Sequence, residues 1–272
     1  MQVSEYSEEN LLAAAITNLN TSGFPNKLSD WLQACLPYDN ITILAYFQNH
    51  QPVPLMCAGS QPKVHENISQ VYLAGAYLLD PFHDLHLKSA PAGVYRLSDI
   101  APDKFRRNQY FLEYYGNTTM VDEIAFVSYP SDGVSLHVCL GRDSNSNRRF
   151  SRRELAYAYR LSPVVTSLTS GHWKDLMPES GRAEGELVSN LIKAIDQKLG
   201  IHLSPRQAEV AMLVLQGHSS VSIGLKLGIS FQTVKVFRKQ LYRKCLISSQ
   251  AELFNLMLPC LTSAPMGPNS RI

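Results

Sequence analysis

The sequence predicts an α+β protein with two domains, an N-terminal αβα sandwich around one antiparallel sheet and a C-terminal all-α domain of four helices. Three observations predict this arrangement. Strand-like runs of β-branched and aromatic residues occur in the first half of the chain, between segments with helical spacing. Only helical patterns follow residue 200, and a polar stretch with glycine and proline precedes them. A chain of 272 residues can form two such domains.

In the N-terminal domain, the order of the elements lets helices cover an antiparallel sheet. The predicted elements are helices over 8–18 and 27–36, strands over 40–47 and 53–58, helices over 65–78 and 102–115, and strands over 123–129 and 134–140. The last two strands flank Pro-Ser-Asp-Gly, which predicts a hairpin. A helix over 151–167 closes the domain, and Ser151 and Glu154 can form its capping box.

The composition shift along the chain predicts the domain boundaries. The expected parts are the N-terminal domain over 1–168, a linker and amphipathic helix over 169–200, the C-terminal domain over 201–260 and a flexible tail over 261–272. Within the second part, residues 185–199 place leucine and isoleucine side chains on one helical face.

Bulk composition excludes several classes of protein. A hydrophobic fraction of 45% with 18% charged residues argues against disorder. The N-terminus is polar and acidic, unlike a signal peptide, and no apolar run approaches the ~20 residues that span a bilayer. The cysteines are odd in number and scattered, without metal-type spacing. We therefore expect reduced core thiols in a cytoplasmic protein with no membrane partner.

The C-terminal domain begins with a strong helix-start signal. Ser204 can cap the helix, Pro205 suits its first position, and Gln207 can close a capping box. Gly224 is small enough for two helices to cross closely, and Gly228 tolerates the positive φ of a tight turn. This spacing predicts a helix-turn-helix.

Charge separates the two domains. Residues 201–258 carry a net charge of +5, whereas the rest of the chain carries −3. A basic face on the helix after Gly228 suits the major groove of double-stranded DNA. A solvated basic face on a structural helix is the alternative, and the coincidence with a helix-turn-helix favours DNA. The residues expected on this face are Gln232, Thr233, Lys235, Val236, Arg238, Lys239 and Arg243.

These motifs resemble the LuxR-type (LuxR/FixJ) DNA-binding domain. The resemblance rests on Leu203-Ser-Pro-Arg-Gln-Ala-Glu209-Val210, Gln216-Gly217, Ile223, Leu227, Ile229-Ser230, Thr233-Val234-Lys235 and Lys244. It implies that Lys235, Val236 and Lys239 face bases or nearby phosphates, and that Gln232, Thr233 and Arg238 hold the DNA backbone. It also implies a homodimer and leaves open whether RNA polymerase is a partner. The sequence departs from the family pattern at Gln207, at Ser222 and at Phe237, where Glu, Glu and His are frequent.

The N-terminal domain lacks the parallel βαβ repeat and acidic cluster of a phosphorylation receiver. Its predicted order resembles the GAF/PAS-like ligand domain of quorum-sensing LuxR proteins and their orphan relatives. Tyr77-Leu-Leu-Asp80-Pro81 matches the pair whose Asp holds the amide of an acyl-homoserine lactone, although Asp before Pro is also an ordinary helix cap. Residues 66–71 lack the aromatic residues expected there, and the two tryptophans, Trp31 and Trp173, are distant in sequence. A lactone is therefore the less favoured ligand.

An aromatic and acidic set of residues suits a small amine or amino-acid-like compound, through cation–π and charge contacts. Core packing is the alternative for each tyrosine. A domain that binds a protein partner in place of a small molecule also stays open. The candidate ligand-binding residues are Tyr46, Tyr72, Tyr77, Asp80, Phe82, Tyr110, Tyr114 and Glu123.

No catalytic, cofactor or metal constellation is readable. The sequence shows no Ser-His-Asp or Cys-His arrangement and no glycine-rich phosphate loop. His83 and His86 share a helical face, but no third ligand has fitting spacing, so we expect surface histidines. The sequence thus predicts a regulator without a cofactor, in preference to an enzyme fused to a DNA-binding module.

Overall fold

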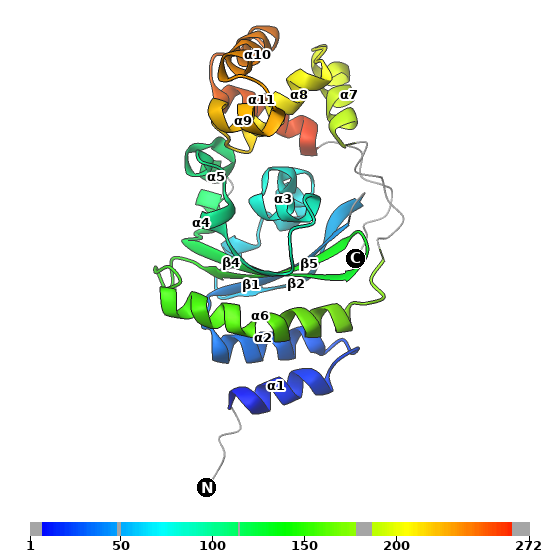
Figure 1. Ribbon diagram of the computed structural model, residues 1–272, viewed down its shortest axis with the longest axis vertical. Helices are drawn as coiled ribbons and strands as arrows, with labels where there is room; N and C mark the ends of the chain where they lie inside the picture. The colour runs from blue at the N-terminus through cyan, green and yellow to red at the C-terminus, as the bar shows by residue number, and fades with distance from the viewer. Residues whose placement is uncertain (1–6, 48–49, 114, 178–186, 263–272) are drawn as a thin grey trace.

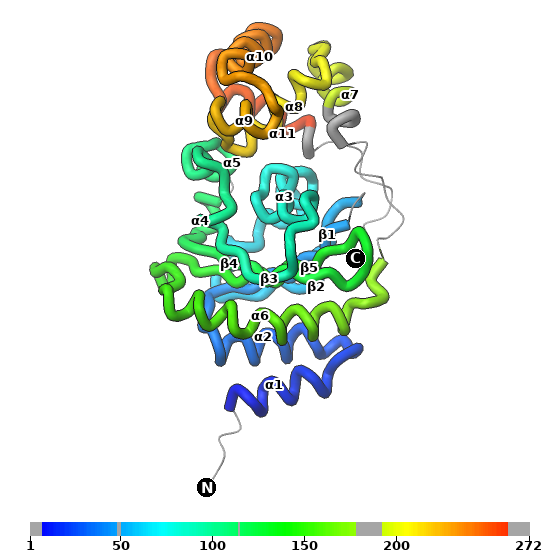
Figure 2. Tube along the Cα trace, in the orientation of Figure 1, coloured from blue at the N-terminus to red at the C-terminus, as the bar shows by residue number. Residues whose placement is uncertain are grey.

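The computed structural model describes residues 7–47, 50–113, 115–177 and 187–262. Figure 1 shows an αβα domain with a helical domain stacked beyond it, and Figure 2 traces the same path. The sheet contains β1 (Asn40–Phe47), β2 (His50–Gly59), β3 (Gly93–Arg96), β4 (Asp122–Ser131) and β5 (Val134–Arg142). These five strands are all antiparallel, in the order β2-β1-β5-β4-β3.

One face of the sheet carries an apolar core. It is covered by α2 (Phe24–Cys35) and α6 (Arg152–His172), with α1 (Glu8–Thr17) outside them (Figure 1). Ile43 and Val138 are paired on neighbouring strands and are buried in this core with Trp31 of α2. The helix predicted over 151–167 thus extends to His172, and its capping box between Ser151 and Glu154 forms as predicted.

The opposite face is more polar and is covered by short helical segments. Leu44 and His137 face each other across β1 and β5, and Thr42 pairs with Cys139. Over these strands lies α3 (Pro81–Leu87), as Figure 1 shows. The face therefore combines hydroxyl, imidazole and thiol groups, whereas the face under α6 is apolar.

The predicted helices over 65–78 and 102–115 do not form as continuous helices, so both predictions were wrong in extent. The first is divided into η2 (Ile68–Tyr72) and η3 (Ala76–Leu79), because Gly75 takes a φ of 156° that ends the helical run. The second contains η4 (Phe105–Arg107) and α5 (Gln109–Glu113), because Asn108 leaves the helical region and its side chain accepts a hydrogen bond from the amide of Phe111. The remaining short elements are η1 (Pro62–Val64), α4 (Leu97–Ile100) and η5 (Tyr115–Thr118). No sequence pattern predicted β3 or α4.

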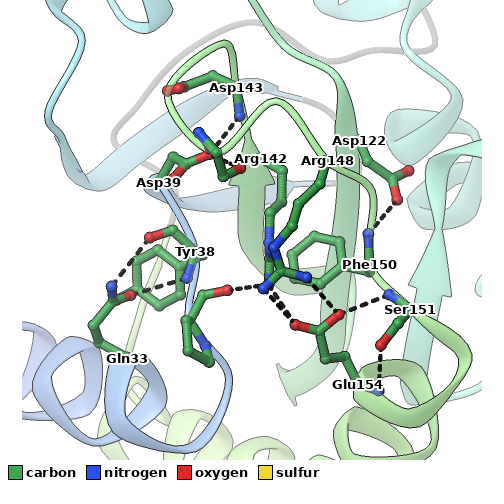
Figure 3. A network of polar contacts seen from close by, with 12 residues as sticks. Gln33, Tyr38, Asp39, Asp122, Arg142, Asp143, Arg148, Phe150, Ser151 and Glu154 are labelled. Atoms are coloured by element: carbon green, nitrogen blue, oxygen red, sulfur yellow. Dashed lines mark hydrogen bonds and ion pairs between the residues drawn. The ribbon is translucent and has the colours of Figure 1, made fainter.

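A buried arginine ties the end of β5 to the start of α6 (Figure 3). Arg142 is 1% exposed, and its guanidinium lies 2.7 Å from Glu154 and donates to the carbonyl oxygen of Pro37 at 2.7 Å. The same guanidinium lies 4.6 Å from the ring centroid of Phe150. Arg148 pairs with the same Glu154 carboxylate at 2.9 Å, but from the surface. Glu154 therefore joins one buried and one exposed arginine while it also caps α6.

The amphipathic helix α7 (Leu187–Leu199) precedes the four helices of the C-terminal domain, which are α8 (Pro205–Leu215), α9 (Ser220–Leu227), α10 (Phe231–Lys244) and α11 (Gln250–Thr262). The predicted capping box of Ser204 and Gln207 is present. Gly228 ends α9 with a φ of 64°, as its place in the turn predicts. A Cβ on Gly224 would lie 2.8 Å from the carbonyl oxygen of Ile229, so the small residue lets the turn fold back closely onto α9.

Hydrogen bonds from side-chain amides to backbone carbonyls connect the two domains. The Gln216 amide donates to the carbonyl of Leu78 at 3.0 Å, and Asn108 donates to the carbonyl of Leu215 at 3.0 Å. Lys226 of α9 lies 3.5 Å from the carboxylate of Asp84 in α3. The helical domain therefore rests on the same short segments that cover the polar face of the sheet.

The exposure of the cysteines and the character of the helices test two sequence-based expectations. The cysteines are free, and all are buried except Cys57, which is exposed on the edge strand β2, so the core expectation was wrong there. No helix in the described ranges has the length and apolar character needed to cross a membrane.

Candidate ligand cavity and nucleic-acid interface

A small cavity of about 60 Å³ lies between the polar face of the sheet and the segments around α3. Strand alternation brings Thr42, Leu44 and Tyr46 of β1 to one wall, because every second side chain points to the same face. The full lining is Asn40, Thr42, Leu44, Tyr46, Val64, His65, Ile68, Tyr72, Asp80, Phe82, Tyr115, Thr118, Met120, Glu123 and Cys139.

Tyrosine hydroxyls connect the two carboxylates of this cavity to its walls. Tyr46 and Tyr72 share a hydrogen bond of 2.5 Å between their hydroxyls, and Tyr72 donates to Asp80 at 2.8 Å. Asp80 also accepts from the amide of Phe82 at 2.9 Å, and so caps α3. Tyr115 donates to Glu123 at 2.9 Å. Each carboxylate thus has neutral donors that fix its position.

Among the described residues, no lysine or arginine pairs with the two carboxylates of this cavity, and only the charge of His83 acts to lower the pKa of Asp80. Burial raises the pKa of Asp80, although hydrogen bonds from Phe82 and Tyr72 oppose the rise. Burial, together with the nearby charge of Asp80, raises the pKa of Glu123 from 4.5 to about 8. A cationic ligand would stabilise the ionised form of these carboxylates.

The structure brings most of the predicted ligand residues together. Tyr46, Tyr72, Asp80, Phe82 and Glu123 line the cavity, whereas Tyr77 and Tyr110 are buried beside it and are not part of its lining. Tyr77 packs against Tyr72 with 6.3 Å between ring centroids, and Tyr110 packs against Tyr115 at 5.9 Å. Tyr114 lies outside the described residues.

Several lining residues were missed by sequence reasoning. Thr42 and Cys139 could have been found from strand alternation, since they are paired across β1 and β5 and share the face of Tyr46. Tyr115 begins the short segment η5 and Met120 lies between η5 and β4, so no periodic signal marks them. The two tryptophans belong to the core on the opposite side of the sheet, where Trp31 is buried and Trp173 packs beside it.

The expectation of surface histidines was wrong. His83 and His86 are 1% and 6% exposed, because α3 turns both side chains toward the sheet. His86 shares a hydrogen bond of 2.8 Å with Ser135, whose hydroxyl lies 3.1 Å from His137. Burial, together with the charge of His83, lowers the pKa of His86 to about 4. Within the described part of the chain, no group of three or more His, Cys, Asp or Glu side chains is arranged to hold a metal ion.

The candidate DNA-contacting face lies on α10, at the end of the molecule farthest from the N-terminal domain (Figure 1). Thr233 is half-buried, and its amide donates to the Ser230 cap at 3.0 Å. Arg238 is also half-buried and donates to the hydroxyls of Ser220 at 3.1 Å and Tyr242 at 3.3 Å. The remaining candidates, Gln232, Lys235, Val236, Lys239 and Arg243, are exposed.

Phe237, where the family pattern has a frequent His, packs against the core as a partly buried side chain. Val234 is fully buried beside it, so these two residues hold α10 on the domain. A basic helix held this way, with its cap at the turn after α9, defines the class of helix-turn-helix transcription regulators.

Comparisons with known proteins identify the family. A model described as bacterial regulatory proteins, luxR family, matches residues 201–257. A curated protein of Aeromonas salmonicida, whose name describes an HTH-type transcriptional regulator in the exeN 3′ region, is 35% identical over 194 residues. The match covers 69% of this chain and 97% of that protein. The chain belongs to the luxR family of bacterial regulatory proteins.

A solved structure shares the fold of the N-terminal domain. The LBD domain of VqsR from Pseudomonas aeruginosa aligns with a TM-score of 0.51 and 23% identity, over 60% of this chain and 94% of that chain. Escherichia coli SdiA aligns with a TM-score of 0.41 and 16% identity, over 96% of this chain and 98% of that chain. The first likeness supports the predicted αβα fold.

Proposed function

We propose that this luxR-family regulator binds a small ammonium compound in the cavity at Asp80 and Glu123, and that the ligand controls its binding to DNA in the cytoplasm. The observation that carries the proposal is a pair of carboxylates held by tyrosine hydroxyls, with no lysine or arginine paired to either one in the described ranges. Tyrosine rings around the cavity favour a cation through their π faces. A cavity of about 60 Å³ suits a small head group more than a large lipid-like chain.

The contacts between the domains support a route from this cavity to α9. Asp80 lines the cavity and caps α3, and Asp84 of the same helix faces Lys226. The carbonyl of Leu78, just before Asp80, accepts from Gln216. A ligand that shifts the Asp80 turn would therefore move two contacts of the DNA-binding domain. We further propose that α10 contacts DNA through Gln232, Lys235, Val236, Lys239 and Arg243, with Thr233 and Arg238 holding the backbone, and that the protein acts as a homodimer.

Titration calorimetry with n-butylamine, and with n-butanol as its neutral counterpart, tests the ammonium site. We expect the amine alone to bind, and Glu123→Gln to weaken it by about tenfold or more, because a buried charge pair is lost. Asp80→Asn should also weaken binding while α3 stays capped, since asparagine caps helices well. Glu113→Gln, an exposed carboxylate of α5, is the matched control and should bind like wild type. Equal binding of amine and alcohol would contradict the proposal.

The same titration has an expected pH dependence. Because the pKa of Glu123 is about 8 in the empty cavity, an ammonium ion must displace a proton below that pH. The apparent association constant should therefore rise with pH by up to about tenfold per unit until pH 8, and then level off while the amine stays charged. In Glu123→Gln the association constant should no longer rise with pH. If the association constant of the wild type does not change between about pH 6 and pH 8, ionised Glu123 is not the binding group.

Removing the side-chain contacts between the domains should loosen their interface. Gln216→Ala with Lys226→Ala removes one hydrogen bond and one partly exposed ion pair. We expect amide hydrogen exchange around Leu78 and Asp84 to accelerate by about five- to thirtyfold, which corresponds to a loss of about 1–2 kcal/mol. Lys193→Ala, an exposed lysine of α7, should leave this exchange unchanged. Unchanged exchange in the double variant would show that these contacts do not hold the domains together.

A further inference from the structure

A second and larger cavity of about 220 Å³ adjoins the first. The two cavities share Tyr115, Met120 and Glu123 as lining residues. Glu123 therefore stands on the boundary between them. A ligand bound at this carboxylate can extend away from Asp80 into the larger space.

The lining of the second cavity also carries positive charge. Arg106 and Arg149 line it, and both are exposed. Two other arginines, Arg96 and Arg148, already form ion pairs. Arg96 pairs with Asp122 at 2.6 Å, and Arg148 pairs with Glu154 at 2.9 Å. In the described part of the chain, neither Arg106 nor Arg149 forms such an ion pair.

The one other carboxylate in the lining of the second cavity is already neutralised. Asp122 accepts two hydrogen bonds from the Arg96 guanidinium, at 3.2 Å and 2.6 Å, and one from the amide of Phe150 at 3.0 Å. The lining of the second cavity thus combines the carboxylate residue Glu123 with two arginines that have no ion pair among the described residues. Arginine binds carboxylates with paired hydrogen bonds, so an anionic group suits these arginines.

We propose that the ligand is a zwitterion whose ammonium group binds at Asp80 and Glu123 and whose carboxylate binds at Arg106 and Arg149. The ammonium half of this inference rests on the proposed function, whereas the carboxylate half rests on the second cavity. The ligand class is an amino acid with its two charges separated by a short aliphatic chain. Such a molecule is complementary to both cavities, while a simple amine uses only the first.

The second cavity also reaches the interface between the domains. Phe105 lines it, and a Cβ on Gly217 would lie 2.9 Å from the Cα of Phe105. The amide of Lys104, next to Phe105, donates to the carbonyl of Gly217 at 3.0 Å. A carboxylate held at Arg106 would therefore lie beside the segment on which the DNA-binding domain rests.

Calorimetry with matched probes tests the zwitterion on the full chain. The probes are 4-aminobutanoate and 6-aminohexanoate, each paired with the amine and with the carboxylate of the same chain length. We expect one amino acid to bind about tenfold or more tightly than its matched amine, because it gains a charge-assisted pair. Arg106→Gln with Arg149→Gln should remove this preference and leave the affinity for the amine within about twofold. Both arginines are exposed, so the variant should fold.

The outcomes separate the two proposals. Equal binding of amine and amino acid, or a preference that survives the arginine double variant, overturns the zwitterion and leaves the ammonium site standing. Binding of neither amine nor amino acid overturns both. Binding of the carboxylates alone, lost in the arginine double variant, also overturns the zwitterion, because it removes the role of Glu123. Glu123→Gln should weaken both amine and amino acid, and Lys104→Gln serves as an exposed cation control near Arg106.

Discussion

Replacing Arg142 with alanine is expected to lower the free energy of unfolding of the N-terminal domain by about 3 kcal/mol. The Arg142 side chain is almost fully buried and contacts Glu154, the carbonyl of Pro37 and the ring of Phe150. Alanine would leave a void and an unpaired backbone carbonyl, and both cost stability. Urea denaturation followed by circular dichroism measures the loss.

Arg148→Ala is the matched control, because Arg148 binds the same carboxylate from an exposed position. Its loss should cost less than about 1 kcal/mol, as is usual for surface ion pairs. Equal costs for the two variants would show that burial does not decide the energetics of this network (Figure 3).

The network also gives the stability a pH dependence. Burial alone would raise the pKa of Glu154, but hydrogen bonds from Arg148 and Ser151 lower it from 4.5 to about 2. Because the pKa of Glu154 is lower in the folded state than in the unfolded state, ionised Glu154 stabilises the fold, and this contribution is fully present above pH 4.5. The contribution is lost as the pH falls toward 2. Glu154→Gln should remove that part of the acid sensitivity.

Replacing both Lys235 and Lys239 with alanine is expected to weaken binding to duplex DNA by about 2 kcal/mol. Both lysine side chains are exposed on α10, so the double substitution should not disturb the core. The Lys235 ammonium lies 4.3 Å from the ring centroid of Phe231, which is itself exposed. Each lysine that neutralises a phosphate releases a counterion, so the dependence of log K on log salt should become shallower by about one per lysine.

Fluorescence anisotropy at several salt concentrations measures both quantities, on a duplex selected for binding from random sequence. Lys174→Ala with Lys193→Ala removes the same charge from exposed positions outside the helix-turn-helix. This control should keep nearly the affinity and salt dependence of wild type. If the control lowers affinity as much as the α10 variant, the contribution of α10 is a general charge effect and not a docked interface.

The cavity was predictable only in part. Asp80 was found because its place before Pro81 is a local signal, and Tyr46 and Tyr72 were found from residue type. The pairing of Tyr115 with Glu123 depends on an irregular segment that folds against β4, so no spacing in the sequence indicates it. His83 and His86 were placed at the surface because helical spacing alone does not tell which face of α3 meets the sheet.

What the sequence determined by itself is the helix-turn-helix. Its caps at Ser204 and Ser230 and its glycines at 224 and 228 act over a few residues, so their effect on the backbone is local. Strands β1, β2, β4 and β5 were predicted for the same reason, from β-branched and aromatic residues and from turn residues.

Only the tertiary structure decided how Asp80 and Glu123 meet at one cavity, how that cavity joins a second, and how the DNA-binding domain rests beside both. These features depend on strand register and on packing between segments distant in the chain. A one-residue slip of β4 would turn Glu123 to the opposite face, and no local pattern encodes that choice.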